Sequence, residues 1–187
     1  IYAGYPHPLA EGDMNLPAVA ILTISDRSSR GERPDLSGPA LIEEVIRLGW
    51  QVVDYSIVGD DPEKIKAYLI DWCDNHAVQM ILTTGGTGFA PRDVTPEATQ
   101  AVIERNAPGL AEYMRMKSFE KTPHAMLSRA VAGIRKATLI VNLPGSPKAA
   151  VENFNFISPV IPHAFQLLTE DASSEQGHLF KPGEKNG

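Results

Sequence analysis

Three glycines in four residues, Gly85-Gly86-Thr87-Gly88, directly follow the apolar-rich segment 78–84. Glycine lets the backbone take positive φ values and bring its N–H groups close to an anion, and the Thr87 hydroxyl adds a donor. The pattern is neither a Walker loop, which ends in Gly-Lys-Ser/Thr, nor a dinucleotide loop, which would need glycine at Pro91. A tight structural turn is the alternative. The position after a strand, with Arg92 and Asp93 nearby, favours a phosphate-binding loop.

Two aspartates could hold a metal ion. Asp60 follows the predicted strand 51–58, and Asp93 lies just beyond the glycines. Carboxyl ends of parallel strands lie along one edge of a sheet, so we expect both carboxylates at the same edge. Proteins usually hold Mg²⁺ with one or two carboxylates and the substrate's phosphates. The alternative is that Asp60 and Asp61 cap the next helix, and we assign that role to Asp61 only.

Two further loops also follow predicted strands. The first, Ser25-Asp26-Arg27, continues to Ser37, which we expect to cap a helix and, with Ser25, to donate to phosphate. The second runs from Pro144 through Gly145 and Ser146 to Lys148 and opens another helix. A lysine there opposes the helix dipole, which makes sense if an anion binds beside it. Simple capping and a solvated lysine are the alternatives.

Other reactive residue types carry less weight. Cys73 lies on an apolar helical stripe, which indicates a buried structural thiol. The five histidines show no metal-ligand spacing with one another or with Cys73. Tyr113, Met114 and Met116 are expected in the core or in a contact between subunits.

Alternating strand and helix patterns position these loops. Apolar strand patterns cover 18–24, 51–58, 78–84 and 137–143, and helix starts occur at Ser37, Asp61-Pro62, Thr95-Pro96 and Ser146-Pro147. The helix beginning at Thr95 is expected to run to about Asn106, and Pro159 and Pro162 should split the last one. The pattern predicts a three-layer α/β fold, with a mostly parallel sheet covered by helices on both faces.

Length and composition set the wider frame. The chain has 187 residues, a formal charge of −6 and one cysteine. We predict one domain over 16–171, a disordered or non-native leader over 1–15, and a flexible tail over 172–187. The negative charge argues against nucleic acid as a partner, no apolar run could span a membrane, and the cysteine content favours the cytoplasm.

A series of sequence blocks resembles a known family. The blocks are, in order, 25–27, 35–39, 84–88, 92–99, 108–110, 126–129, 133–135 and 143–147. The series is similar to the molybdopterin adenylyltransferases, the MogA type of the MogA/MoaB family, and to the G domains of plant and animal homologues. The resemblance covers about 18–168, and its run from Gly85 to Thr99 is highly specific.

The resemblance implies a homotrimeric enzyme of molybdenum cofactor biosynthesis. Such enzymes transfer AMP from Mg-ATP to the terminal phosphate of molybdopterin, release pyrophosphate, and pass the product to a molybdate-inserting partner. Asp60 and Asp93 match the family's essential acidic positions, Ser128 and 144–148 match regions of pterin and phosphate contact, and the glycines match the nucleotide side. The alternatives are a MoaB-like pterin-binding homologue, a non-catalytic binding module and a hydrolase related to the competence-damage family.

Overall fold

The structure is a computed structural model that describes residues 17–169, so the predicted leader 1–15 and tail 172–187 lie outside the described residues. The elements are β1 (Ala18–Ile24), α1 (Asp26–Ser29), α2 (Ser37–Arg47), β2 (Gln51–Val58), α3 (Pro62–Asn75), β3 (Met80–Thr84), α4 (Thr95–Gln100), β4 (Arg105–Asn106), α5 (Pro108–Phe119), η1 (Pro123–Leu127), β5 (Ala132–Arg135), β6 (Thr138–Leu143), α6 (Pro147–Ile157), η2 (Ser158–Val160) and α7 (Ile161–Leu168). No helix in the described part is long and apolar enough to cross a membrane.

One sheet organises the chain, with strand order β2-β1-β3-β6-β5-β4. The first four strands in that order are parallel, and β5 runs antiparallel to both of its neighbours. The chain moves from β1 outward to β2 and then returns past β1 to β3. This reversal leaves a switch point between β1 and β3, where open α/β sheets bind their ligands.

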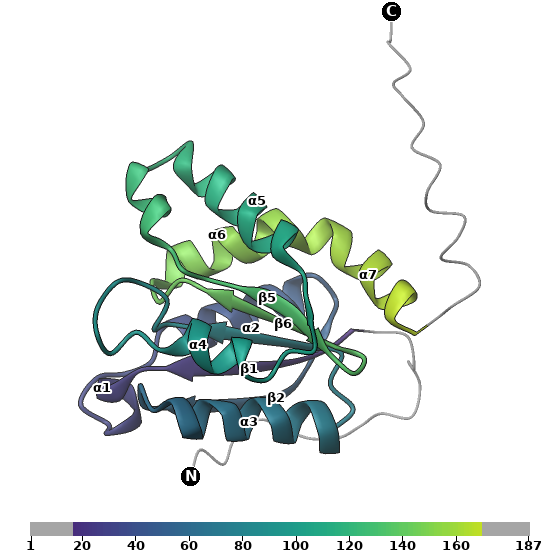
Figure 1. Cartoon of the computed structure of the whole chain (residues 1–187), viewed down its shortest axis with the longest axis horizontal. Coiled ribbons are helices and arrows are strands. Elements are labelled where there is room, and N and C mark those ends of the chain that lie inside the picture. The colour runs from purple at the N-terminus through teal and green to yellow at the C-terminus, as the bar shows by residue number, and fades with distance from the viewer. Residues whose placement is uncertain (1–16, 170–187) are drawn as a thin grey trace, which may run out of the picture.

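Helices cover both faces of this sheet, as predicted. In β1, Val19 and Ile21 pack into the core beneath α2, α5, α6 and α7, while the alternate residues Ala20 and Leu22 pack against α3 and α4. This alternation follows from the two-residue period of a strand. Figure 1 shows α3 below the sheet and α5, α6 and α7 above it. The three-layer, mostly parallel α/β fold is confirmed.

Several local predictions hold. Asp61 caps α3, accepting hydrogen bonds from the backbone N–H groups of Glu63 and Lys64. Ser146 caps α6, and the helical region after it splits at Ser158–Val160, the segment that contains the first of the two prolines. Cys73 is buried, and burial raises the pKa of its thiol to about 11, as a structural cysteine requires.

Other local predictions are wrong. The helix that begins at Thr95 ends at Gln100, where the Val102 N–H bonds the Thr99 carbonyl three residues back and so tightens the last turn. The chain then forms β4, which pairs with β5; both strands are too short for their alternation to stand out in the sequence. Residues 26–29 form a short helix instead of a loop.

The predicted cap at Ser37 is also wrong. Ser37 is already helical, and the Asp35 carboxylate accepts the N–H groups of Ser37 and Gly38 in its place. The Ser37 hydroxyl is therefore released for another contact, described below.

Candidate active site

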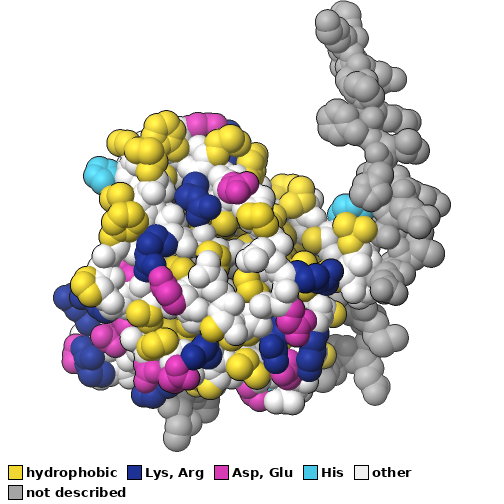
Figure 2. All heavy atoms as spheres, in the orientation of Figure 1, with side chains coloured by type: hydrophobic (Ala, Val, Ile, Leu, Met, Phe, Trp, Pro, Cys, Tyr) yellow, Lys and Arg dark blue, Asp and Glu magenta, His cyan; other side chains and the backbone are white. Residues whose placement is uncertain are grey.

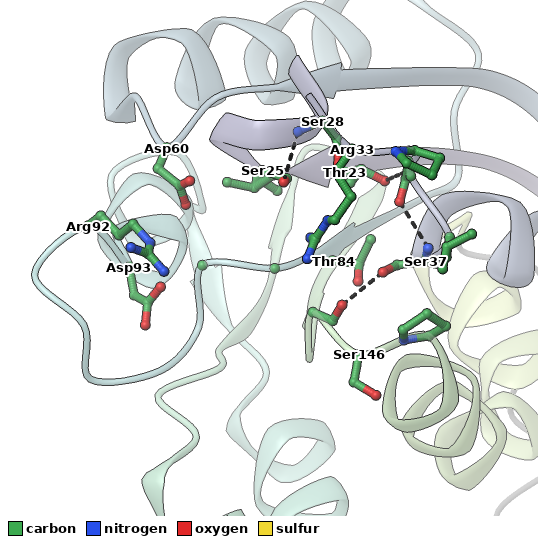
Figure 3. Close-up of a pocket in the computed structure, with 18 residues that line it drawn as sticks. Thr23, Ser25, Ser28, Arg33, Ser37, Asp60, Thr84, Arg92, Asp93 and Ser146 are labelled. Atoms are coloured by element: carbon green, nitrogen blue, oxygen red, sulfur yellow. Dashed lines mark hydrogen bonds between the residues drawn. The ribbon is translucent and has the colours of Figure 1, made fainter. Parts of the chain in front are cut away.

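A cleft of about 370 Å³ opens at the carboxyl ends of β1, β3 and β6, over the switch point (Figure 3). This volume is in the range of small-molecule sites. Its lining comes from four loops that are far apart in the sequence. The lining residues are Thr23, Ile24, Ser25, Ser28, Arg33, Pro34, Asp35, Leu36, Ser37, Asp60, Thr84, Gly85, Gly86, Arg92, Asp93, Gly145, Ser146 and Pro147.

The cleft brings together most of the residues singled out from the sequence. Nine of them line it: Ser25, Ser37, Asp60, Gly85, Gly86, Arg92, Asp93, Gly145 and Ser146. Four others, Asp26, Thr87, Gly88 and Pro144, lie directly behind or beside the lining and bond to it or to its supports. Ser128, at the end of η1, and Lys148, exposed in the first turn of α6, are outside the lining.

Asp60 is held by a reciprocal pair of hydrogen bonds with Asp26. Each carboxylate accepts the other residue's backbone N–H, at 3.1 Å to Asp60 Oδ2 and 3.0 Å to Asp26 Oδ1. Burial raises the pKa of the Asp60 carboxyl; the hydrogen bond from Asp26 and the nearby Arg92 oppose the rise, while the charges of Asp26 and Asp93 add to it. The ionised site thus concentrates negative charge that a cation would offset.

The glycine loop passes very close to β1. Gly85 has φ +103° and Gly86 has φ +63°, both in the region that glycine favours. A Cβ on Gly85 would collide with the carbonyl oxygen of Ile24, and one on Gly86 would collide with the Thr95 hydroxyl. That hydroxyl in turn donates to the Gly85 carbonyl at 2.9 Å. These two positions require glycine both for backbone conformation and for space.

Arg129 holds the far half of this loop. Its guanidinium donates to the carbonyls of Gly88 and Asp93 and pairs with Glu97, and its backbone N–H donates to the Thr87 carbonyl. Arg129 belonged to a block of the family resemblance, but nothing in its local sequence indicated this contact. Five-donor guanidinium geometry suits it to fixing several carbonyls at once.

A second set of bonds joins the remaining two loops. Asp35 accepts from the hydroxyls of Thr23 and Tyr55, each at 2.6 Å, and so fixes the start of α2. The Ser37 hydroxyl then donates at 2.8 Å to the carbonyl of Gly145, in the loop that follows β6. Sequence reasoning missed Asp35, because its partners lie on β1 and β2.

Away from the cleft, apolar side chains gather on the outer surface. Met116, Phe119 and Met126 are each at least half exposed and, with Arg115, line a shallow depression over α5 and η1. Figure 2 shows this apolar patch at the top of the molecule. The three residues expected in the core or in a subunit contact differ in burial. Met114 is buried in the core, whereas Tyr113 and Met116 are exposed.

Comparison with known proteins identifies the family. Residues 20–163 match the family model described as "probable molybdopterin binding domain". The chain is 42% identical over 171 residues to the molybdopterin adenylyltransferase of Helicobacter pylori (strain J99), covering 90% of this chain and 93% of that protein. It is 49% identical to the molybdopterin biosynthesis enzyme MoaB of Thermus thermophilus, with a TM-score of 0.79 over 83% of this chain and 98% of that one.

A longer relative shows the same unit as one part of a larger protein. The chain is 45% identical over 155 residues to the Drosophila melanogaster molybdenum cofactor synthesis protein cinnamon, covering 82% of this chain. It spans about a quarter of that protein, 26% of its length. With a family match over most of its length, the chain belongs to the molybdopterin-binding domain family.

Proposed function

We propose that this protein is a molybdopterin adenylyltransferase, which transfers AMP from ATP to the terminal phosphate of molybdopterin and releases pyrophosphate in molybdenum cofactor biosynthesis. The observation that carries the proposal is the likeness to a named adenylyltransferase along 93% of that protein's length. The position and lining of the cleft support it, because open α/β sheets bind ligands at strand ends and phosphoryl transfer relies on positioning and charge stabilisation.

The reaction needs no nucleophile from the protein. An oxygen of the molybdopterin phosphate attacks the α-phosphorus of ATP, and the bond from that phosphorus to the bridging oxygen of pyrophosphate breaks. The protein must align the two phosphates and stabilise their charge. The cleft supplies hydroxyls from Ser25 and Ser146, backbone at Gly85 and Gly86, and the guanidinium of Arg92. We assign Thr87, Gly88 and Asp26 to shaping this side, and Pro144, Gly145, Lys148 and Ser128 to phosphate and pterin contact.

Asp60 and Asp93 fit a magnesium ion that arrives with ATP. Both line the cleft, and they are close enough for the charge of Asp93 to disfavour ionisation of Asp60. Within residues 17–169, no group of three or more His, Cys, Asp or Glu side chains forms a metal cage. Two carboxylates completed by substrate phosphates are the usual setting for Mg²⁺. When bound, the ion would neutralise charge on the α-phosphate and the leaving pyrophosphate.

The remaining proposals concern assembly and location. We propose a cytoplasmic homotrimer that hands its product to a molybdate-inserting enzyme. The apolar patch of Met116, Phe119 and Met126 supports association, since such patches mark interaction sites. Light scattering of the purified protein measures the subunit number directly, and a monomer at working concentration would contradict the trimer.

The transfer reaction is tested by incubating the protein with molybdopterin, ATP and Mg²⁺ and separating adenylylated pterin and pyrophosphate by chromatography. Product should form and should disappear with EDTA. Asp60→Asn and Asp93→Asn should each lower the rate by roughly 100-fold or more, on the order of the cost of losing one transition-state electrostatic contact. Asp61→Asn is the matched control, because Asp61 caps α3 outside the cleft and asparagine also caps helices.

A MoaB-like protein that binds pterin without transferring AMP is the second candidate. The 49% identity to the Thermus MoaB enzyme favours it. Tight molybdopterin binding with no adenylylated product, under conditions where the Helicobacter enzyme is active, would establish this alternative and would leave Asp60 and Asp93 without a role in transfer.

A further inference from the structure

The cleft has an unequal charge distribution. Asp60, Asp93 and Arg92 lie together at one side, and Arg33 reaches in from the opposite side (Figure 3). Arg33 and Arg92 are the only cationic side chains among the described lining residues. Arg92 acts on the acidic side, where its charge favours ionisation of Asp60. Arg33 therefore provides the cationic side of the cleft.

The acidic residues nearest to Arg33 in the chain are engaged elsewhere. Glu32 is bound by Arg30 through two hydrogen bonds, at 2.7 and 3.2 Å. Asp35 accepts four groups, namely the hydroxyls of Thr23 and Tyr55 and the backbone N–H groups of residues 37 and 38. No described residue forms a hydrogen bond or an ion pair with the Arg33 guanidinium. It is therefore free to bind an anion.

The same bonds also hold Arg33 at the cleft. Asp35 fixes the segment that follows Arg33 to β1 and β2 through the side chains of Thr23 and Tyr55. Pro34, between the two residues, restricts the backbone. The loop is therefore fixed on one side of Arg33, and Figure 3 shows the guanidinium end directed into the cleft.

We infer that Arg33 is a substrate-binding residue that holds a phosphate on the side of the cleft away from Asp60 and Asp93. The inference rests on the proposed function for the identity of the substrates. A guanidinium matches phosphate because its fork of N–H groups can donate to two oxygens. ATP and molybdopterin both carry phosphate, so binding assays with each show which of them Arg33 holds.

The test compares Arg33→Gln with Arg105→Gln. Arg105 carries the same charge, is exposed on β4 outside the cleft lining and has no described side-chain partner, so its variant controls for net charge without releasing an acidic side chain beside Arg33. Calorimetry would measure binding of ATP with Mg²⁺, of molybdopterin, and of inorganic pyrophosphate. For the phosphate that Arg33 holds, Arg33→Gln should weaken binding roughly 10- to 100-fold, as expected for a charged hydrogen-bonding pair. Arg105→Gln should stay within about 2-fold, and Arg33→Lys should fall between the two glutamine variants.

The outcomes separate the two proposals. If the wild type forms adenylylated pterin but Arg33→Gln binds every ligand within about 2-fold of it, the role of Arg33 is refuted and the proposed function stands. If the wild type forms no product, pyrophosphate and molybdopterin binding still test Arg33, and equal binding by the variant refutes it. Unchanged melting temperatures are expected, because Arg33 is exposed and has no described partner to lose.

Discussion

Replacing Gly85 by alanine should separate two costs that glycine avoids. The first is conformational, because φ at Gly85 is +103°, and such strain costs about 1–3 kcal/mol in a residue with a side chain. The second is steric. The new methyl would collide with the carbonyl oxygen of Ile24, which belongs to β1 and is registered against Val58 of β2. A backbone atom within a paired strand cannot move aside cheaply, and overpacking of this kind costs about 1–3 kcal/mol. We expect a total loss of about 2–6 kcal/mol, the sum of these two ranges.

Gly31→Ala is the matched control for that substitution. Gly31 also has positive φ, +72°, but nothing lies within 4 Å of an added Cβ. Only the conformational cost applies, and φ of Gly31 is near the left-handed helical region, so its loss should be about 1–2 kcal/mol. Urea unfolding gives both free energies, provided that the m value is unchanged. If the two variants lose equal stability within about 0.5 kcal/mol, a difference that such measurements can resolve, close packing against Ile24 does not constrain the glycine loop.

Three more substitutions or reactions test other parts of the molecule. Asn142→Ala should destabilise the fold by about 2–4 kcal/mol in urea unfolding. It leaves the Val131 N–H without its side-chain acceptor and removes the two buried hydrogen bonds from the Asn142 amide to Thr83 and Thr99. A loss below about 1 kcal/mol would contradict this. Asp60→Asn should raise the free energy of unfolding at pH 7 without Mg²⁺. The raised pKa of Asp60 means that its stabilising contribution is present below its unfolded pKa and is lost as the pH rises through its folded pKa. The gain should shrink as the pH falls towards about 4, and a gain that is independent of pH would refute the assignment. The Cys73 thiol, with its pKa of about 11, should react with a thiol reagent at neutral pH only after unfolding, so rapid labelling of the native protein would show that it is not buried.

The sequence predicted the main strands and helices better than it predicted the short strands and the helix ends. Continuous apolar strands and capped helices led to the correct three-layer fold, because burial on both faces leaves a strong local pattern. The two-residue strand β4 left no such pattern, and its existence depends on pairing with β5. The cap of α2 was misassigned to Ser37 for a related reason: Asp35, two residues earlier, takes that role.

The candidate site shows the same division. Residues at strand ends, such as Asp60 and Gly85, were found because topology places strand ends together. Arg129 was not found as a support, because its partners are backbone carbonyls about 40 residues earlier in the chain, the Gly88 bond having a separation of 41. The bonds from Asn142 to the hydroxyls of Thr83 and Thr99 were not found either, because those residues are also distant in the chain. Bonds between a side chain and a distant part of the chain depend on the final packing, so a single sequence carries little sign of them.

The unequal charges of the cleft favour one orientation of an elongated polyanion that binds in it. The side with Asp60 and Asp93 repels phosphate unless a metal ion comes with it, whereas the side with Arg33 attracts phosphate without help. Under the proposed function, a substrate bound through metal and one bound through Arg33 would therefore lie at opposite sides of the cleft, and their reacting atoms would meet over the strand ends between them. That is the arrangement that in-line transfer between two phosphates requires. The two sides come from different loops, which the reciprocal Asp26–Asp60 hydrogen bonds join directly. The Ser37–Gly145 and Thr84–Pro144 bonds form a second link between them. Under the proposed function, the alignment of the substrates would depend on these hydrogen bonds as well as on the charged residues themselves.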